Sequence, residues 1–333
     1  MSYSTPSEPD QVLPVYSARD LIASDGANLG DPLGLADDLI AGDVYQLSVG
    51  VERASLALTV PDEGAFLIAP ETEAGHVGAS VALDSCVTFM SPDGAVVEAL
   101  LLVEHGHDDH SVCDLHVYSL AEMSPRVAYA VVAIDRDAAH MRFAEAACVS
   151  FTQGTHITMA NGSQRAIEEL GTGDRVLTRD HGVQPIRWIG QRTVRAHGAF
   201  APIRIRQGTL NNSRDLIVSP NHRLFVYQRS DQLGVGRAEV LVRAKHLLDG
   251  EAVTQTAGGF VDYYQILFDR HEIIYAEGIA VETFLVDHTT RSALPHDVPL
   301  GGNGTGNDRA VELNERHLRA HRAAEILRKA SVG

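Results

Sequence analysis

The sequence predicts a mainly β protein built from two domains. Short apolar stretches of strand length recur along the chain, and Gly, Pro and Asp residues separate them. The charge also changes near the middle: residues 1–147 hold 24 acidic and 5 basic side chains, a net charge of −19, whereas residues 148–333 hold 20 and 22, a net charge of +2. A chain of 333 residues is long enough to bury two cores.

Residues 1–145 are expected to form an acidic, mostly antiparallel β domain. A loop-rich segment, residues 30–41, is followed by seven stretches that resemble short strands. They are Asp43–Ser48, Ala54–Val60, Gly64–Ala69, Ser80–Met90, Val96–Glu104, Leu115–Leu120 and Arg126–Ile134. Regular short strands divided by turns are typical of an antiparallel sandwich. This half contains no pattern that indicates catalysis.

Residues 146–290 are expected to form a second β domain. Its candidate strands are His156–Ala160, Val176–Thr178, Gln184–Ile189, Ala201–Arg206, Asp215–Val218, Leu224–Gln228, Glu239–Arg243, Val261–Phe268 and Glu272–Ala276. Residues 167–174 are typical of a helical turn that ends at glycine. Residues 291–333 are expected to be a linker and a C-terminal amphipathic helix. Asp308 is the candidate N-cap of that helix, whose apolar side would carry Val311, Leu318, Ile326 and Leu327.

The composition bears on compartment and partners. No apolar run reaches the roughly 18 residues that a membrane-spanning helix needs, and residues 1–6 lack the features of a secretory signal. The three cysteines, Cys86, Cys113 and Cys148, indicate no disulfide framework. We therefore expect a cytoplasmic protein, or one exported without an N-terminal signal peptide.

Charge argues against nucleic acid and membrane as partners. The acidic half repels polyanions and anionic lipid surfaces. The basic side chains of the second half are spread over strands without interleaved aromatic residues, which favours a solvated sheet face over a nucleic-acid site. They are Arg187, Arg192, Arg195, Arg204 and Arg206.

One cluster in the first half is dense in residue types that bind metals. It runs from Glu104 to His110 and continues with Cys113, Asp114 and His116. Imidazole and thiolate groups suit zinc or copper, but the spacing fits no closed four-ligand site. We interpret the cluster as a solvated loop between two apolar strands, with metal binding as the alternative. No metal and no cofactor are expected.

Four segments of the second half occur together in one order. The first is Ser150–Ile157 (SFTQGTHI), and the second runs from Ile167 to Leu177 with Gly173-Asp174 near its end. The third is Val218–Val226 (VSPNHRLFV), and the fourth runs from Tyr264 through Asp269 and His271 to Gly278. Together they resemble the Hint module, the fold shared by hedgehog autoprocessing domains and inteins. The resemblance covers residues 146–290.

The resemblance implies a protein that acts on its own backbone. In this family a Cys, or less often a Ser, opens the module and attacks the carbonyl just upstream of its own amide, forming an ester or thioester. The matching position is Ser150, so the scissile bond would be Val149–Ser150. Ser219 and His222 match the block that supplies an oxyanion donor and a proton, with His222 as the general acid.

Departures from the family pattern leave the nucleophile open. A serine hydroxyl is a weaker nucleophile than a thiolate at neutral pH, and the β-branched Val149 crowds the attacked carbonyl. Cys148 is the better nucleophile by chemistry but stands two residues out of register. Ser150, Cys148 and no competent nucleophile are therefore three alternatives. The fold could also be an inactive Hint scaffold that serves binding or assembly.

The later blocks limit what can follow the first step. Glu282 and Thr283 stand where inteins carry His-Asn, so splicing and Asn-driven C-terminal cleavage are not expected. Gly190 stands where hedgehog domains carry a carboxylate for sterol activation. What remains is cleavage of the protein's own N-terminal segment, with water or a small nucleophile as the acyl acceptor. Asp269 and His271 could assist this step or form a structural pair.

Overall fold

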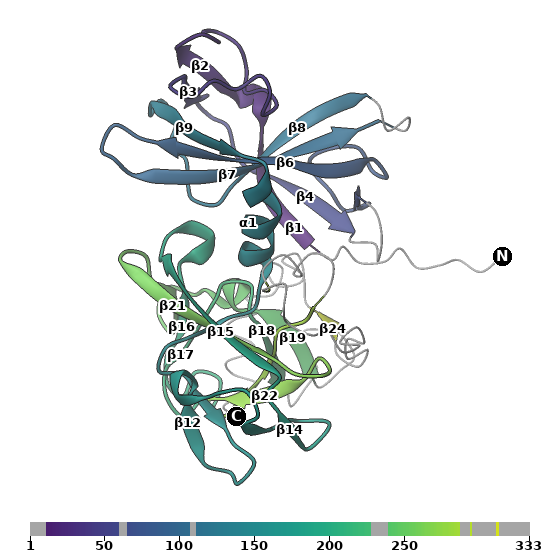
Figure 1. Cartoon of the computed structure of the whole chain (residues 1–333), viewed down its shortest axis with the longest axis vertical. Coiled ribbons are helices and arrows are strands. Elements are labelled where there is room, and N and C mark those ends of the chain that lie inside the picture. Colours follow the sequence, from purple (N-terminus) through teal and green to yellow (C-terminus); the bar gives the residue numbers. More distant parts are fainter. Residues whose placement is uncertain are drawn as a thin grey trace, which may run out of the picture. The chain divides into compact units, whose positions relative to one another are not determined.

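The computed structural model describes residues 11–59, 65–106, 111–227, 239–286, 294 and 311–312. The chain divides into two compact units, Met1–Glu145 and Ala146–Gly333, and strands are the predominant regular elements of each (Figure 1). This confirms the mainly β class predicted from the sequence. Within the described ranges, no helix combines the length and apolarity that crossing a bilayer requires.

The first unit contains one nine-stranded sheet, in which every paired strand is antiparallel. Its strands are β1 (Gln11–Ser17), β2 (Leu21–Asp25), β3 (Val44–Leu47), β4 (Ala54–Thr59), β5 (Phe66–Ile68), β6 (Ser80–Met90), β7 (Val96–His105), β8 (Val112–Ser119) and β9 (Tyr129–Asp135). A 3-10 turn, η1 (Ala18–Asp20), joins β1 to β2, and helix α1 (Asp137–Ala147) follows β9.

The sheet of the first unit closes on itself. The order is β2-β3-β9-β6-β5-β4-β1-β8-β7, and an additional pairing between β6 and β7 closes the strands from β6 to β7 into a ring, from which β9, β3 and β2 extend. Strand β6 achieves this because it is long and its register shifts between Leu83 and Ser85. Such an irregularity bends a strand, so one edge of β6 pairs with β5 and then with β9. The prediction of two packed sheets is therefore wrong, because these strands form a single sheet. Closing part of that sheet leaves fewer unpaired strand edges.

The seven strands expected in this half correspond to β3–β9, whereas β1, β2 and α1 were not expected. Pro14 stands in the middle of β1, opposite Ser55 of β4. Proline within an apolar run argues against a strand, which explains why the segment was missed. The interior of the unit is lined by alternating side chains such as Val87, Phe89 and Leu101.

The cluster of metal-binding residue types that begins at Glu104 was expected to be a solvated loop, but Glu104 itself is a buried carboxylate. The Glu104 side chain is fully buried and accepts hydrogen bonds from His76 Nδ1 at 2.7 Å and His116 Nε2 at 3.0 Å. Burial by itself raises the pKa of Glu104, but the bonds from His116 and His76 outweigh it and hold the pKa below its usual value. The solvated-loop interpretation is thus wrong for Glu104 and His116, while residues 107–110 lie outside the described residues.

We predict that Glu104→Ala destabilises the first unit by about 2 kcal/mol, because it leaves a buried hydrogen-bond donor without its acceptor. The partner here is His116, which is 3% exposed. Urea unfolding followed by far-ultraviolet circular dichroism measures the change. The matched control is Glu122→Ala at an exposed position, which should change the free energy of unfolding by less than about 0.5 kcal/mol. Equal stability of the two variants would contradict the prediction.

The second unit contains two larger sheets and one hairpin. The six-stranded sheet has the order β15 (Trp188–Arg195), β21 (Phe260–Leu267), β10 (Phe151–Thr152), β17 (Leu216–Val218), β16 (Ile203–Ile205) and β20 (Val253–Gln255). The seven-stranded sheet has the order β12 (Gln164–Ala166), β11 (His156–Thr158), β22 (Ile273–Ala276), β23 (Ile279–Glu282), β18 (Arg223–Tyr227), β19 (Glu239–Arg243) and β24 (Val311–Glu312). The hairpin joins β13 (Arg175–Leu177) to β14 (Val183–Pro185).

Three 3-10 turns connect these strands: η2 (Ile167–Glu169), η3 (Gly198–Phe200) and η4 (Ala244–Leu247). The first occupies the segment where a helical turn was expected. Most of the expected C-terminal helix lies outside the described residues. Val311 and Glu312 form β24, which pairs in parallel with β19, so Val311 does not occupy the helical position expected for it.

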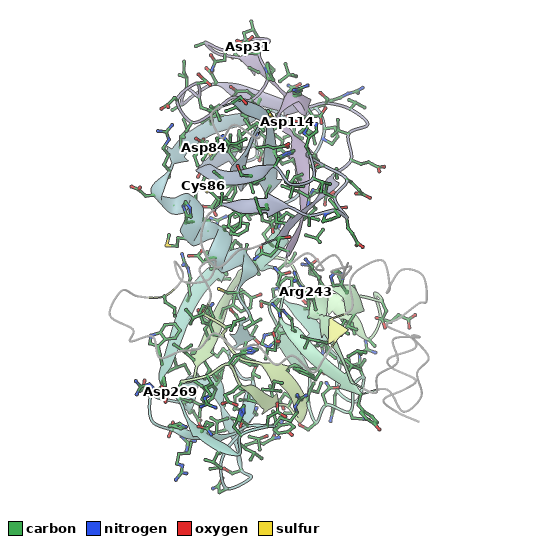
Figure 2. The ribbon with its side chains drawn as sticks, turned by 90° about the vertical axis from the view of Figure 1, so that its right-hand side faces the viewer. Asp31, Asp84, Cys86, Asp114, Arg243 and Asp269 are labelled. Carbon is green, nitrogen blue, oxygen red and sulfur yellow. The ribbon has the colours of Figure 1, made fainter. Side chains whose placement is uncertain are left out.

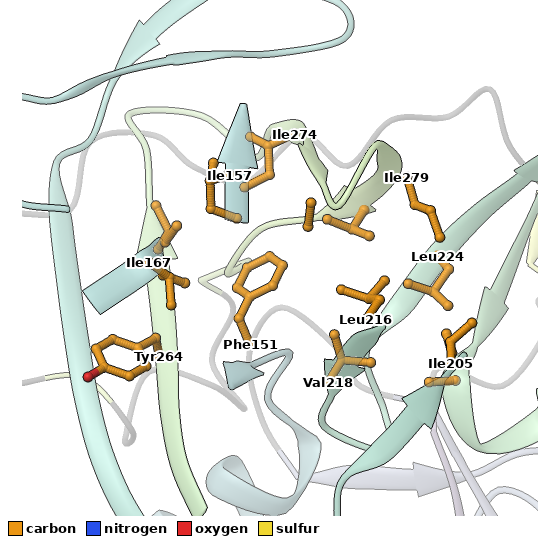
Figure 3. Packing of buried hydrophobic residues seen from close by; sticks show 14 of the residues in the cluster. Phe151, Ile157, Ile167, Ile205, Leu216, Val218, Leu224, Tyr264, Ile274 and Ile279 are labelled. Carbon is orange, nitrogen blue, oxygen red and sulfur yellow. The ribbon is translucent and has the colours of Figure 1, made fainter. Parts of the chain in front are cut away.

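One apolar core joins the sheets of the second unit. Phe151 lies in it with Val218 and Tyr264, and Ile157 and Ile274 come from the seven-stranded sheet (Figure 3). Side chains of a strand alternate between its two faces. Because Phe151 points into the core, Ser150 must point to the opposite face of the six-stranded sheet. The core thus sets the orientation of the candidate nucleophile.

Candidate functional site

Strand β10 places Ser150 between two neighbouring strands. Phe151 pairs with Val218 of β17 on one side and with Tyr264 of β21 on the other. One residue earlier, the same antiparallel registers bring Ser150 opposite Ser219 and Gln265. Gln265 in turn pairs with Gly190 of β15. These four residues form one row across the sheet, and directly opposed residues share a face.

A tight turn carries both members of the motif that contains Ser219 and His222. The amide of His222 donates to the carbonyl of Ser219 at 3.0 Å, which closes a four-residue turn with Pro220 at its second position. The turn holds the chain that precedes Ser150, because the Asn221 side-chain amide donates to the carbonyl of Ala146. Two residues three apart in the sequence are thereby brought against one backbone segment.

The Ser219 hydroxyl lies on the amide of the predicted scissile bond. Ser219 Oγ accepts from the backbone N–H of Ser150 at 3.0 Å and donates to the carbonyl of Cys148 at 3.1 Å. The Ser219 backbone N–H also donates to the Ser150 carbonyl at 2.9 Å. Ser150 and Ser219 are 5% and 8% exposed. The hydroxyl therefore contacts the nitrogen of the predicted scissile bond, whereas the sequence analysis expected Ser219 to be the oxyanion donor and His222 to supply the proton.

His222 lies one peptide further along the chain than its predicted role requires. Its Nδ1 is 3.1 Å from the carbonyl oxygen of Ser150, and its ring packs edge-on to Phe151 with centroids 4.5 Å apart. The side chain is fully buried, and burial lowers its pKa to about 4; the carbonyls of Ser150 and Glu282 offset this only in part. The imidazole is consequently neutral at neutral pH and donates from Nδ1.

Gln265 belongs to this site, although the sequence did not indicate it. Its Nε2 donates to Ser150 Oγ at 3.3 Å, so it contacts the predicted nucleophile directly. The two residues are 115 positions apart. The only signal in the sequence was the place of Gln265 in the fourth Hint-like segment, where attention fell on Asp269 and His271 instead.

The alternative nucleophile, Cys148, is packed among apolar side chains. It is 2% exposed and belongs to a small cluster with Leu267 and Phe284, against which Trp188 also packs. The backbone carbonyl of Cys148, rather than its thiol, contacts Ser219. The structure thus places Ser150 within the hydroxyl–amide network and places the Cys148 side chain in an apolar cluster beside it.

The structure separates Asp269 from the other predicted site residues. Its carboxylate is 61% exposed and pairs with Arg187 at 2.7 Å, and Figure 2 shows it at the periphery of the second unit. His271 is buried instead, with Nε2 4.0 Å from the carboxylate of Glu282. Burial lowers the pKa of His271, and Glu282 opposes that shift. The two residues expected to act together therefore occupy different environments.

Glu282 and Thr283, which follow the fourth Hint-like segment, are buried polar residues. The backbone of Glu282 contacts His222, which in turn contacts the carbonyl of Ser150. Glu282 is 5% exposed and lies 3.5 Å from Arg223, while Thr283 is 1% exposed and donates from Oγ1 to the carbonyl of Glu272 at 2.8 Å. Among the residues that the structure describes, no group of three or more His, Cys, Asp or Glu side chains could hold a metal ion.

The comparison with family models agrees with this architecture. Residues 149–288 match the model of the Hint domain. The second unit of this chain therefore contains a Hint domain, a domain of the autoprocessing type to which inteins belong. A search of curated proteins found no match.

Solved structures similar to this chain are inteins and intein-like domains. A bacterial intein-like domain from Clostridium thermocellum is 18% identical, with a TM-score of 0.30, over 40% of this chain and 97% of that one. The TvoVMA intein is 17% identical, with a TM-score of 0.29, over 40% and 96%. A DnaB intein from Synechocystis sp. is 11% identical, with a TM-score of 0.27, over 40% and 98%.

We predict that the buried, neutral His222 makes the second unit less stable in mild acid. Its pKa is about 4 in the folded chain and about 6.5 when exposed. The unfolded chain therefore binds more protons between these values, so stability is fully present above about pH 6.5 and falls as the pH drops toward 4. The loss attributable to His222 is on the order of 3 kcal/mol.

Urea unfolding followed by the fluorescence of Trp188, the single tryptophan, measures this pH dependence. His222→Gln should flatten the dependence between pH 6.5 and 4, whatever it does to the absolute stability. The exposed His197→Gln is the control and should keep the slope of the unsubstituted protein. An unchanged slope in His222→Gln would show that this imidazole is not the responsible group.

Proposed function

We propose that the Hint domain rearranges the peptide bond between Val149 and Ser150 by an N-to-O acyl shift. Hydrolysis or transfer to a small nucleophile then separates residues 1–149 from the remainder. The observation that supports this most directly is the position of the Ser219 hydroxyl, 3.0 Å from the amide nitrogen that would leave. The protein's own N-terminal segment is then the substrate.

The shift is an isomerisation that needs no other reactant. A bond forms from Ser150 Oγ to the carbonyl carbon of Val149, and the bond from that carbon to the Ser150 nitrogen breaks. The hydroxyl proton ends on the nitrogen, which becomes a free amine. The side chain of Ser150 is on the face that also carries Ser219 and Gln265, so the reacting hydroxyl and the proton donor share one side of the sheet.

Ser219 is the group best placed to protonate the leaving nitrogen. Its hydroxyl already bridges the Ser150 amide and the Cys148 carbonyl, so a small rotation directs its proton at the nitrogen. His222, with a pKa of about 4, is protonated in only about one molecule in a thousand at pH 7. In this proposal the neutral imidazole holds the Ser150 carbonyl and Ser219 carries the proton, which revises the general-acid role expected for His222.

The steps that follow are limited by the late block. The buried Glu282 and Thr283 occupy the places of the intein His-Asn pair, and neither side chain can cyclise as asparagine does. The ester therefore persists until water or an added small nucleophile attacks it. Because Ser150 is only 5% exposed, we expect that attack to be slow.

We predict that hydroxylamine splits the purified chain into residues 1–149, as the hydroxamate, and 150–333, which intact-mass spectrometry would detect. Ser150→Ala should abolish cleavage. Ser219→Ala should slow it by at least about 100-fold, because it removes the proton donor. Ser219→Thr keeps a hydroxyl and should retain most of the rate. Ser163→Ala, at an exposed position of the same domain, should cleave normally.

If the chain stays intact in hydroxylamine while the variants fold normally, the acyl-shift proposal is wrong. Cleavage that persists in Ser150→Ala would move the nucleophile elsewhere, and Cys148→Ala would then test the neighbouring thiol. Equal rates in Ser219→Ala and Ser219→Thr would remove the proposed role of the hydroxyl.

We predict that Ser150→Cys accelerates the first step. A thiol ionises near pH 8.5, so thiolate is far more accessible than serine alkoxide at neutral pH. The product is a thioester, which dithiothreitol captures by thiol exchange. The variant should therefore cleave in dithiothreitol at least about tenfold faster than the serine protein cleaves in hydroxylamine. A slower variant would argue that the backbone around residue 150 is not set for attack.

The same geometry leaves an inactive scaffold as the second candidate. It is favoured by the low exposure of Ser150 and by the β-branched Val149, both of which hinder attack on the carbonyl. In that case the network of Ser219 and His222 only joins strands β10 and β17. A Ser150→Cys variant that is folded but inert would support this candidate.

A further inference from the structure

In the row of residues across the six-stranded sheet, the side-chain amide of Gln265 contacts Ser150, as the Ser219 hydroxyl also does. Ser219 lies on one side of Ser150 and Gln265 on the other, and the Gln265 side-chain amide contacts the hydroxyl itself. Both neighbours approach from hydrogen-bonded strands, so their positions are fixed by backbone register and not by a mobile loop. The hydroxyl of Ser150 is thus held from the β21 side while its amide is held from the β17 side.

We infer that Gln265 is a catalytic hydrogen-bond donor to the Ser150 hydroxyl. This inference rests on the proposed acyl shift and adds a residue to it. By donating from Nε2 to Oγ, the amide orients the hydroxyl and stabilises the negative charge that grows on the oxygen as its proton leaves. The amide does not take the proton, because it stays uncharged over the whole working pH range.

The surroundings of Gln265 explain why an amide serves here. Leu267 lies two residues further along β21 on the same face as Gln265, and Trp188, which pairs with Leu267, packs against it. A charged side chain in such apolar surroundings would pay a large desolvation cost, whereas a neutral amide pays less. Gln265 is also half-buried on a central strand, which restricts its rotation.

Gly190 completes the arrangement from the next strand. It pairs directly with Gln265, and a Cβ at this position would lie 2.1 Å from the Trp188 ring. The indole therefore occupies the space in which a side chain at position 190 would stand. With no side chain opposite it, the Gln265 amide reaches across the row to Ser150 without competition from β15.

The first test compares two variants with the unsubstituted chain by the rate of hydroxylamine cleavage. Gln265→Leu removes the donor and should slow cleavage about fivefold to tenfold, the value of one neutral hydrogen bond. Gln265→Glu has nearly the same size but cannot donate once its carboxyl is ionised, so at neutral pH it should cleave no faster than Gln265→Leu. A Gln265→Leu rate equal to that of the unsubstituted chain would overturn the inference.

The second test does not depend on cleavage. In a Cys113→Ser background, which removes the exposed thiol, Ser150→Cys introduces one thiol in contact with Gln265. Its ionisation is followed by the ultraviolet absorbance of thiolate as the difference from the same background without it. Adding Gln265→Leu should raise the thiol pKa, because the donor no longer stabilises the thiolate. Gln265→Asn, with a shorter side chain, should also raise it.

The two tests separate the two proposals. If hydroxylamine cleaves nothing but the thiol pKa responds to Gln265→Leu, the acyl shift is wrong and the contact with residue 150 stands. If cleavage occurs but neither the rate nor the thiol pKa responds, the acyl shift stands and Gln265 has only a structural part. Circular dichroism of each variant confirms that the sheet is intact.

Discussion

The candidate site depends on the position of the two-residue strand β10 between β17 and β21. Phe151 anchors it, because its ring is 1% exposed in the core and packs against His222. A slip of one residue would reverse the faces, taking Ser150 into the core and Phe151 out of it. The burial of one aromatic ring thus decides which groups meet Ser150, and the hydrogen bonds from Ser219 and Gln265 follow from that register.

The same burial sets the chemical character of the site. The groups around Ser150 are a hydroxyl, an amide and an imidazole whose pKa of about 4 keeps it uncharged. An uncharged set can reorganise protons within a peptide without bringing an ion into the interior. The nearby charged side chains of Glu282 and Arg223 pair with one another, so neither is left as an uncompensated ion. Such a site suits an isomerisation better than a hydrolysis with free access of water.

The first unit shows that the spacing of residues along a sequence does not reveal all the partners of a side chain. Residues 104–116 contain many ligand types, yet Glu104 takes one of its partners from His76, which is 28 positions away in another connection. The neighbours along the chain could not reveal this pairing, nor that it is buried. Likewise, seven strands were foreseen from their turns, but the closure of their sheet depends on the register shift in β6, which has no signature in composition.

The sequence by itself determined the mainly β class and the Hint family, because alternation, turn residues and motif order are local properties that survive without coordinates. The sequence also identified Ser150, Ser219 and His222 as candidate site residues, because each belongs to a short local motif. Tertiary structure alone decided which atoms they touch. Only the structure shows that Gln265 contacts Ser150 and that Asp269 does not belong to the site. Strand register and side-chain direction depend on packing across the sheet, where Ser150 and Gln265 meet although they are 115 positions apart.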